Sequence, residues 1–539
     1  MTMAGRRWFA LVFAAAAAYV SLSQEMLWMR MVSYITGGDP SVFAHVLGVF
    51  LVGVALGALA AEKLCERGFA GAISPATFVG VMLAGSAILY WLSLGLIARL
   101  FVAAPLLAGV ATYAVVCAVS FLLGGVFPVV CHWGTEEGEA VGLAVSRIYM
   151  ANIVGSTLGP LLTGFVLMEY LPLERIIVLL SAVAVLLGGA ALAMERRWRR
   201  WPVLLAPALA AGMVAAGGWL YQGFLERLHF QSHWNPACAY KTVLHNRCGI
   251  IAVAEDPSGM ADMLYGCGMF DGTFNVDPWL NSNGIDRAYM IAALHPRPRS
   301  VLEIGLASGS WSRVIAAYEP VERHVIVEIN PRYVDLVAQY APQKDLLRDP
   351  RVEIHFDDGR RWLMRNRGEK FDLIVQNTTW HWRSQITNLL SAEYLTMCRE
   401  RLNGGGVMYF NATGSEDAVY TAARVFRHVV RYQWFVAASD SPFALAPEQV
   451  HANLLKFAFD GRAVFDESRP EYAALARRLA AHPLIDVGEA LRQRRDLWLV
   501  TDDNMATEYK RRRWYDPRAT WGALWGRWRS GSETGSEKR

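Results

Sequence analysis

The stretch VLEIGLASGSWSRVIA, residues 301–316, places two glycines where a backbone could meet a ligand. Val301–Ile304 is apolar enough to be a buried strand, and the next five residues form the turn into a predicted helix. Glycine allows a ligand to approach the turn closely, and the first N–H groups of a helix lack intrahelical partners. Gly305, Ser308 and Gly309 are therefore candidate binding residues, although a tight strand-to-helix turn also needs glycine for packing alone.

Acidic residues end the next two predicted strands. Glu328 lies in the strand His324–Ile329, about twenty residues after the glycine turn, a spacing at which a carboxylate can hold two ribose hydroxyls. Asp357 and Asp358 follow the third strand, where they could accept hydrogen bonds from an adenine amino group. The three strand ends together favour a nucleoside pocket over the alternative, in which the acids cap the following helices.

A fourth predicted strand, Phe371–Val375, runs into the polar sequence QNTTWHWR. Its carboxyl end should border the same crevice. Asn377 cannot take a proton at neutral pH, whereas His381 is a natural general base. Trp380 could form part of an apolar or cation-holding wall. In the competing interpretation, this aromatic and basic loop packs on the apolar first half of the chain.

A sheet is needed to bring these strand ends together. Predicted strands alternate with helical stretches up to GGGVMYFNATGS, 404–415, which predicts a doubly wound, mainly parallel sheet. Before it, Cys248–Asn275 alternates enough to indicate a small antiparallel region. The seven cysteines show no CxxC pair or Cys/His spacing typical of zinc, so we expect no metal site.

The first half of the chain is too apolar for a soluble domain. The 539 residues are 54% hydrophobic and 19% charged, but the charges are sparse before about Tyr221 and return after Leu225. Glycines at helix-packing intervals indicate a compact bundle. We predict seven membrane spans, each near the ~20 residues that a bilayer core requires, at 8–30, 41–61, 76–98, 105–131, 147–168, 174–194 and 202–222.

Three polar residues fall where hydrocarbon is expected: Glu25, Arg30 and Asn152. Intramembrane charge usually faces a bundle interior or a cavity, so these residues are functional candidates. The plainer interpretation is an internal pair between Glu25 and a basic partner, which would fix helix packing. A transport pathway would need more polar lining than this.

The side of the membrane on which the second half lies depends on the segment 202–222. Basic residues gather on one face of the predicted bundle, at Arg6, Arg7, Lys63, Arg67 and the cluster from Arg196 to Arg200. The positive-inside rule makes that face cytoplasmic, and seven spans then place the second half outside. A re-entrant segment, which Pro202 and Pro207 would favour, returns it to the cytoplasm.

We divide the chain into a transmembrane helical bundle (1–224), a linker with a small antiparallel region (225–285), a Rossmann-like domain (286–509) and a basic, aromatic tail (510–539). The tail could lie on the membrane surface, or form an ordinary closing helix, and we expect its polar end to be disordered. The basic clusters have no nucleic-acid-binding framework around them, so we expect no nucleic acid partner.

Several motifs, in order along the chain, resemble the spermidine synthase family and specifically its membrane-fused bacterial branch. In the first half these are EMLWMR, FLLGGVFP and RIYMANIVGSTLGPLLTGFVL, and in the second half LHPRPRSVLEIGLASG, VEIN, DDGRRWL and LVTDDNMATEY. The resemblance implies a domain of the S-adenosylmethionine-methyltransferase type, a cosubstrate derived from S-adenosylmethionine, a bacterial inner-membrane location and homodimers.

The resemblance also implies aminopropyl transfer from decarboxylated S-adenosylmethionine to putrescine, but two segments depart from the family. Asn377 and Trp380 occupy the positions of an Asp-x-x-Asp segment, and an amide cannot accept the proton of the attacking amine. Arg287 stands where an acid would suit a cationic substrate. The usual mechanism is therefore not expected, and His381 is the candidate replacement base.

Three function hypotheses follow. The first is a membrane-bound transferase that uses S-adenosylmethionine or its decarboxylated form, moves an aminopropyl or methyl group, and has a small-molecule, peptide or lipid acceptor other than a simple diamine. The second is an extracytoplasmic domain that reuses the fold for cofactor-free chemistry on an exported peptide or lipid. The third is a noncatalytic binding scaffold or a transporter with a sensing domain. In each, the bundle contacts membrane lipid.

Overall fold

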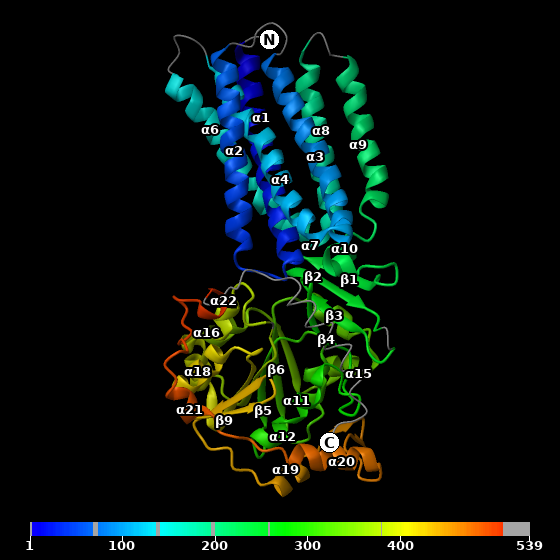
Figure 1. Ribbon diagram of the computed structural model, residues 1–539, viewed down its shortest axis with the longest axis vertical. Helices are drawn as coiled ribbons and strands as arrows, with labels where there is room; N and C mark the ends of the chain where they lie inside the picture. Colours follow the sequence, from blue (N-terminus) through cyan, green and yellow to red (C-terminus); the bar gives the residue numbers. More distant parts are fainter. Residues whose placement is uncertain are drawn as a thin grey trace.

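The computed structural model describes residues 3–67, 74–135, 141–195, 200–256, 259–378 and 380–509. The predicted tail lies outside the described residues, as do Arg196, Arg197 and Arg199 of the basic cluster. Long helices form a bundle at the N-terminal end of the molecule, and a globular α/β half lies at the other end (Figure 1).

Seven helices or helix pairs are long and apolar enough to cross a membrane, by length and composition. They coincide with the seven predicted spans, with small differences at the ends. Their elements are α1 (Met3–Ile35), α2 (Val42–Glu66), α3 (Pro75–Ala103), α4 (Pro105–Gly124) with α5 (Val126–Gly134), α6 (Val141–Leu162) with a π-helical turn (Thr163–Leu167) and α7 (Met168–Tyr170), α8 (Leu173–Ala193), and α9 (Arg200–Leu220).

Glycines let the helices approach each other closely. A Cβ atom on Gly155 of α6 would lie 2.0 Å from the carbonyl oxygen of Ala15, and one on Gly57 of α2 would lie 2.0 Å from that of Phe121. Neither distance is sterically possible, so these helix pairs require glycine at the contact. The predicted helix-packing glycines therefore hold backbones together inside one bundle.

The segment predicted as either a span or a re-entrant loop is one continuous helix. Pro207 lies inside α9, yet the helix runs without interruption from Arg200 to Leu220. It lies beside α8 along the length of the bundle (Figure 1). The N-terminus and the globular half consequently lie at opposite ends of seven helices.

The three polar residues that were predicted to lie within the membrane differ in their surroundings. Glu25 is buried and forms no ion pair among the described residues, so the predicted internal pair is not formed there. Arg30, near the end of α1, instead reaches out of the bundle to the turn after β1. Its guanidinium donates hydrogen bonds to the carbonyl oxygens of Asn246 and of Arg247, the latter at 3.2 Å. Asn152 is half-buried on α6.

The globular half contains two main sheets. The first is antiparallel, in the order β1 (Tyr240–Asn246), β2 (Gly249–Ala254), β3 (Met263–Gly266), β4 (Met269–Thr273). The second has the order β10 (His428–Tyr432), β11 (Phe435–Ser439), β9 (Leu402–Asn411), β8 (Phe371–Gln376), β5 (Ser300–Ile304), β6 (Arg323–Glu328), β7 (Val352–Phe356). A short pair, β12 (Ala458–Phe459) and β13 (Arg462–Ala463), lies apart.

The large sheet is mainly parallel, as the sequence predicted, with an antiparallel hairpin added at one edge. Strands β9, β8, β5, β6 and β7 are parallel, but β10 and β11 form a hairpin that adds antiparallel to β9. Gln433, in the hairpin turn, has a φ of 54°. Only two residues separate these strands, which is too few for the crossover that a parallel connection needs.

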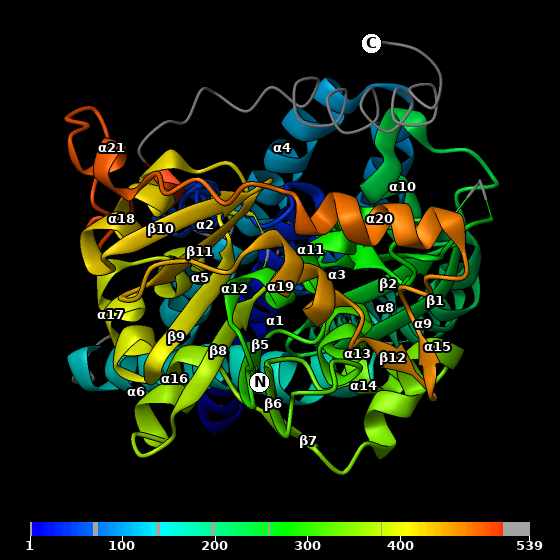
Figure 2. The same ribbon diagram turned by 90° about the horizontal axis from the view of Figure 1, so that it is seen from below.

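Helices cover both faces of the large sheet (Figure 2). Val301 packs on the face covered by α13, α19 and α20, and Leu302 packs on the face covered by α16, α17 and α18, because successive strand residues point to opposite sides. The remaining helices are α10 (Phe224–Phe230), α11 (Asp286–Tyr289), α12 (Ile291–Leu294), α13 (Ser310–Ala316), α14 (Arg332–Val337), α15 (Ala341–Lys344), α16 (Gly359–Arg365), α17 (Ala392–Glu400), α18 (Glu416–Val425), α19 (Pro447–Leu454), α20 (Pro470–Ala480), α21 (Gly488–Arg492) and α22 (Ala506–Tyr509).

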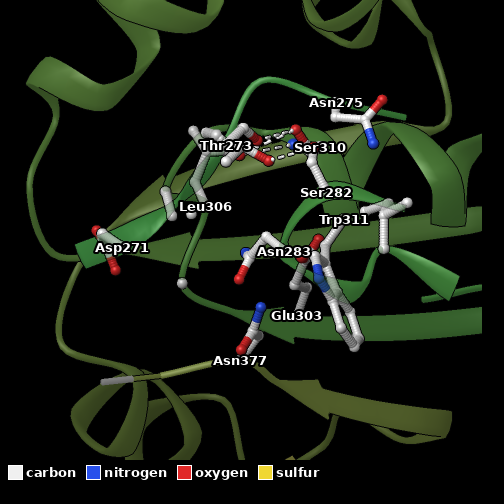
Figure 3. Close-up of a pocket in the computed structure, with 15 residues that line it drawn as sticks. Asp271, Thr273, Asn275, Ser282, Asn283, Glu303, Leu306, Ser310, Trp311 and Asn377 are labelled. Carbon is white, nitrogen blue, oxygen red and sulfur yellow. Dashed lines mark hydrogen bonds between the residues drawn. The ribbon is translucent and has the colours of Figure 1, made fainter. Parts of the chain in front are cut away.

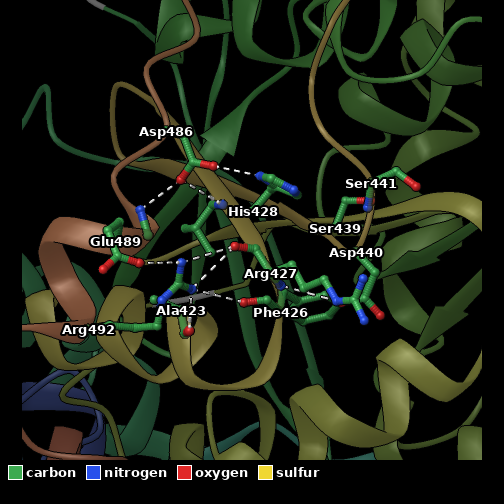
Figure 4. A network of polar contacts seen from close by, with 12 residues as sticks. Ala423, Phe426, Arg427, His428, Ser439, Asp440, Ser441, Asp486, Glu489 and Arg492 are labelled. Atoms are coloured by element: carbon green, nitrogen blue, oxygen red, sulfur yellow. Dashed lines mark hydrogen bonds and ion pairs between the residues drawn. The ribbon is translucent and has the colours of Figure 1, made fainter.

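A polar network fixes α21 against the edge strand β10 (Figure 4). Asp486 accepts hydrogen bonds from His428 Nδ1 at 2.9 Å and from the N–H of Gly488 at 2.8 Å. Arg492 donates to the carbonyl oxygens of Ala423, at 2.9 Å, and of Arg427, at 3.2 Å. These bonds satisfy backbone groups at the end of α18 and hold the C-terminal segment on the sheet.

The carboxyl edge of the parallel strands faces the helical bundle. Ser384, in the loop that follows β8, donates its N–H to the carbonyl oxygen of Gly38, between α1 and α2, at 2.8 Å. Gly268, before β4, lies so close to Tyr34 that a Cβ atom on it would be 2.4 Å from the carbonyl oxygen of Tyr34. Figure 1 shows α12, which precedes β5, at the far end of the globular half. Ligands of this edge would therefore bind next to the bundle.

We expect Arg30→Ala to weaken the contact between the two halves. The substitution removes a charged donor from two carbonyl oxygens, a loss of about 1.5–3 kcal/mol per hydrogen bond. The midpoint of thermal unfolding in detergent should fall by several degrees, whereas Arg67→Ala, at an exposed position just after α2, should leave it unchanged. Equal midpoints for both variants would contradict a role for Arg30 in the contact.

Candidate functional site

A narrow pocket lies against the glycine turn at the carboxyl end of β5 (Figure 3). Its walls come from β4, from the segment between β4 and α11, from the turn itself and from the residue that follows β8. The free space inside is about 10 Å³, which is room for about one water molecule. A larger ligand could enter only if part of the wall moved.

The two glycines of the turn have different roles. Gly305, with φ 94°, lines the pocket, and a Cβ atom on it would meet only the Asn377 oxygen, at 3.8 Å. Gly309, with φ 70°, precedes α13, and a Cβ atom there would lie 2.9 Å from Val337. Gly305 thus leaves the turn open to a ligand, while Gly309 is required for packing.

Ser308 also lines the pocket and ties the turn to β4. Its hydroxyl donates to Ser310 Oγ at 3.0 Å, and Ser310 Oγ donates to the carbonyl oxygen of Thr273 at 2.8 Å. Both serines are buried. The chain of bonds, drawn in Figure 3, holds the antiparallel sheet and the glycine turn together at the pocket.

Glu328 lies at the end of β6, where the sequence predicted it, but its carboxylate is directed at the backbone. One oxygen accepts a hydrogen bond from the N–H of Leu306 at 2.7 Å, and the other accepts one from Asn330 at 2.8 Å. Burial raises the pKa of this carboxyl to about 7. Glu328 is not among the residues that line the pocket, so its contact with a ribose stays a prediction.

Asp357 and Asp358 lie outside the pocket, at the end of β7. Asp358 caps α16 by accepting a hydrogen bond from the N–H of Arg361 at 2.8 Å. Asp357 forms ion pairs with Arg361 and Arg365, the latter at 3.2 Å. These contacts match the capping alternative, and a contact with adenine stays a prediction.

Asn377 lines the pocket, whereas His381 and Trp380 do not. Asn377 Oδ1 accepts a hydrogen bond from Asn411 at 3.3 Å. The Nδ1 atom of His381 lies 3.1 Å from the carbonyl oxygen of Thr413, so we assign the ring proton to Nδ1. This leaves Nε2 as a proton acceptor, and burial lowers the pKa of the ring, which keeps it neutral near pH 7.

The loop that carries His381 also packs on the helical half, as the competing interpretation predicted. Besides the Ser384 bond to Gly38, the Arg383 side chain lies where a Cβ atom on Gly38 would be, 3.0 Å from it. Trp382 lies 3.5 Å from the corresponding position on Gly37. The base candidate and the bundle contact therefore share one loop.

Arg287 has a structural position. Its guanidinium donates hydrogen bonds to the carbonyl oxygens of Gly284, at 2.8 Å, and of Asn283. It also lies over the ring of Phe435, 5.1 Å from the centroid. Arg287 thus holds the segment that forms one wall of the pocket, and its charge is directed away from the pocket.

Most of the pocket residues were not candidates from the sequence, among them Asp271, Glu303 and Trp311. Glu303 interrupts the apolar strand VLEI, and a charged residue inside a buried strand is a signal that could have identified it. Asp271 and Trp311 carry no such signal. Among the described residues, no group of three or more His, Cys, Asp or Glu could hold a metal ion.

Comparison with known proteins places residues 288–441 in the spermine/spermidine synthase domain. A polyamine aminopropyltransferase of Pyrobaculum aerophilum is 27% identical over 187 residues, which is 32% of this chain and 64% of the relative. That of Aeropyrum pernix is 30% identical over 158 residues, which is 28% of this chain and 50% of the relative. The chain thus spans between half and two thirds of these relatives.

A solved spermidine synthase, in complex with the transition state analogue AdoDATO, is 19% identical, with a TM-score of 0.36, over 46% of this chain and 86% of that one. The domain match and the named relatives confirm the resemblance to the spermidine synthase family that the sequence motifs predicted. The matched region contains the glycine turn, Glu328 and Asn377.

The pKa of Glu328 predicts a pH dependence of stability. A carboxyl whose pKa rises from 4.5 to about 7 on folding stabilises the fold fully below about pH 4.5 and loses this contribution, of about 3 kcal/mol, as the pH rises through 7. The thermal midpoint of the wild type should therefore fall across this window relative to Glu328→Gln, which cannot titrate. Parallel pH profiles of the two proteins would contradict the shift.

Proposed function

We propose that the protein is a membrane-anchored transferase of the aminopropyltransferase type, which binds a donor derived from S-adenosylmethionine and acts on an acceptor other than a simple diamine. The observation that carries the proposal is the arrangement at one sheet edge of the glycine turn, the Glu328 carboxylate bonded to that turn, and the loop with Asn377 and His381. Crevices at the carboxyl ends of parallel strands are the usual ligand sites of such sheets.

The residues of this edge suit the donor in part. Gly305 leaves the turn open to a ligand, and Glu328 follows the turn by about twenty residues, the sequence spacing at which an acid can hold a ribose. The donor would supply an electrophilic carbon beside a sulfonium. Because the pocket holds about one water molecule, donor binding requires part of the wall to move.

His381 is the proton acceptor in this proposal. The acceptor nitrogen would form a bond to the carbon, the carbon–sulfur bond would break with its electrons left on sulfur, and Nε2 of His381 would take the nitrogen's proton. Its Nδ1 contact with Thr413 and its lowered pKa both leave Nε2 free to do so. Asn377 cannot take the proton but can orient the acceptor by hydrogen bonding.

The acceptor would come from the membrane side. The sheet edge faces the bundle, and the loop with His381 packs on the residues between α1 and α2. A soluble diamine needs no such arrangement, whereas a lipid or a membrane-bound peptide would reach this edge along the bundle. The matched relatives act as polyamine aminopropyltransferases by name, so the change of acceptor is the part that belongs to this chain.

A second candidate is favoured by the number of helices. Seven crossings place the globular half on the face opposite the basic residues Arg6, Arg7, Lys63 and Arg67, which the positive-inside rule makes extracytoplasmic. An adenosyl donor is not expected there. The fold would then serve cofactor-free chemistry on an exported peptide or lipid, for which Asn377 in place of an acid needs no replacement base.

Donor binding tests the first proposal directly. We expect at least one of methylthioadenosine, S-adenosylmethionine and decarboxylated S-adenosylmethionine to bind the full-length protein in detergent, measured by calorimetric titration. The proposal places one donor site at the glycine turn of each chain, so the heat should saturate at one site per chain. Absence of binding by all three would end the transferase proposal.

The proposed base gives a second test. Once an acceptor is found, His381→Gln should lower the transfer rate by about 10²–10⁴-fold, because general base catalysis contributes that much, with donor affinity unchanged. His355→Gln, a half-exposed histidine on β7, is the matched control and should keep wild-type rate. A fully active His381→Gln variant would exclude the histidine as the base.

Reporter fusions after Leu225 decide between the two candidates. The transferase proposal requires green fluorescent protein fused there to fluoresce, since its donor is made in the cytoplasm. The second candidate requires alkaline phosphatase fused at the same residue to be active. Fusions after Glu66, at the end of α2 on the opposite face of the bundle, should give the reverse pattern in either case.

A further inference from the structure

Glu303 is a buried acid that the proposed mechanism does not use. It lies in the middle of β5, is fully buried, and has one carboxylate oxygen 3.0 Å from Nε2 of His324, which is also fully buried. Its other oxygen, Oε1, has no hydrogen-bond partner among the described residues. Leaving a buried acceptor without a hydrogen bond costs about 1–3 kcal/mol of folding free energy, and more if the acceptor is charged. We therefore expect this oxygen to have a hydrogen-bond partner.

The pocket is where that partner would lie. Glu303 is one of its lining residues, and Figure 3 shows it in the wall with Asn283, Trp311 and Asn377. Nε1 of the buried Trp311 also has no partner among the described residues. The unsatisfied oxygen of Glu303 indicates a missing hydrogen-bond donor at this space, whereas Nε1 of Trp311 needs an acceptor and would not be satisfied by the same group.

The charge of the pocket specifies the group. Its second acidic residue is Asp271, a half-buried side chain whose Oδ2 accepts a hydrogen bond from Tyr333 at 2.5 Å. The described residues that line the pocket include no lysine, arginine or histidine, and the others are neutral. Arg383 offsets the charge of Asp271, whereas Oε1 of Glu303 has no donor among the described residues, so a positively charged hydrogen-bond donor would be favoured beside Glu303.

The size of the pocket limits which group could bind there. About 10 Å³ of free space accommodates one group the size of a water molecule. A primary ammonium group has that size and offers three N–H donors. It could donate to Oε1 of Glu303 while its carbon chain left the pocket toward Asn377, which a guanidinium or a sugar could not do without displacing the walls.

His324 orients the carboxylate. Glu303 pairs with Ile326 in the register of β5 and β6, so His324, two residues earlier, projects from the same face of the sheet. With its proton on Nε2, the imidazole donates to Oε2, and Oε1 is left for a group in the pocket. A lone carboxylate in an apolar strand would lack this fixed direction.

We propose that Glu303, oriented by His324, is the site at which this pocket binds the primary ammonium group of an aliphatic amine. The site deepens the proposed function, on which it rests only for the identity of the amine: the acceptor, or the aminopropyl end of the donor. Its position differs from that of the missing acid at Asn377, so amine recognition in this chain has moved from the loop after β8 to the strand β5.

The test compares amine and neutral ligands on the full-length protein in detergent by calorimetric titration. For the wild type we expect propylamine and 1,4-diaminobutane to bind at least tenfold more tightly than 1-propanol. In Glu303→Gln this preference should disappear, whereas Glu448→Gln, at an exposed position on α19, should retain it. Methylthioadenosine, which has no ammonium group, should bind wild type and Glu303→Gln within about twofold of each other if it binds.

Decarboxylated S-adenosylmethionine distinguishes the two sources of the amine. If the ammonium belongs to the donor, Glu303→Gln should weaken this ligand at least tenfold; if it belongs to the acceptor, the variant should bind it as the wild type does. No preference for propylamine over 1-propanol in the wild type would overturn the site, even if Glu303→Gln does not fold. Amine binding without binding of any adenosyl ligand would uphold the site and overturn the proposed transferase.

Discussion

The carboxylate of Glu328 joins the ends of β5 and β6, because its two oxygens accept hydrogen bonds from Leu306 and Asn330. This interaction fixes the glycine turn. The turn then positions Ser308, Ser310 and the wall of the pocket. The bonds are made in a buried environment, where a carboxylate needs donors. The geometry of the whole sheet edge depends on this acid having its donors in place.

The second constraint is the contact between the two halves of the chain. Arg30 and the residues between α1 and α2 reach the globular half at the turn after β1 and at the loop after β8. A membrane anchor alone would need only a linker. Here the bundle instead contacts the loop that carries the candidate base. A movement of the helices would therefore shift the position of that loop.

The pocket combines an open glycine turn with acidic walls. Asn377 removes the proton acceptor that the spermidine synthase resemblance leads one to expect, yet two acidic side chains, Glu303 and Asp271, line the space. Arg287, which looked from the sequence like a barrier to cationic ligands, is turned to the carbonyl oxygens of Asn283 and Gly284. In the proposal above, Glu303 takes over the binding of a cation from the acid that Asn377 replaces.

Residue type in short windows was sufficient for much of this protein. Local hydrophobicity and turn chemistry predict the seven apolar helices and the glycine turn at 305–309. The amide at position 377 can be read directly from the sequence. The family resemblance rested on the same motifs. The antiparallel β10–β11 hairpin was not predicted, because the residues of a short strand do not show which neighbour it pairs with or in which direction.

Only the tertiary structure decided which polar groups meet. Glu303 and His324 are brought together by the register of β5 on β6, and Asp357 is turned to Arg361 and Arg365 instead of the pocket. The loop at 380–384 meets Gly38 across more than three hundred residues of sequence. Sequence determined the elements because they depend on neighbours along the chain, whereas the direction of a buried carboxylate depends on partners that only packing brings within reach.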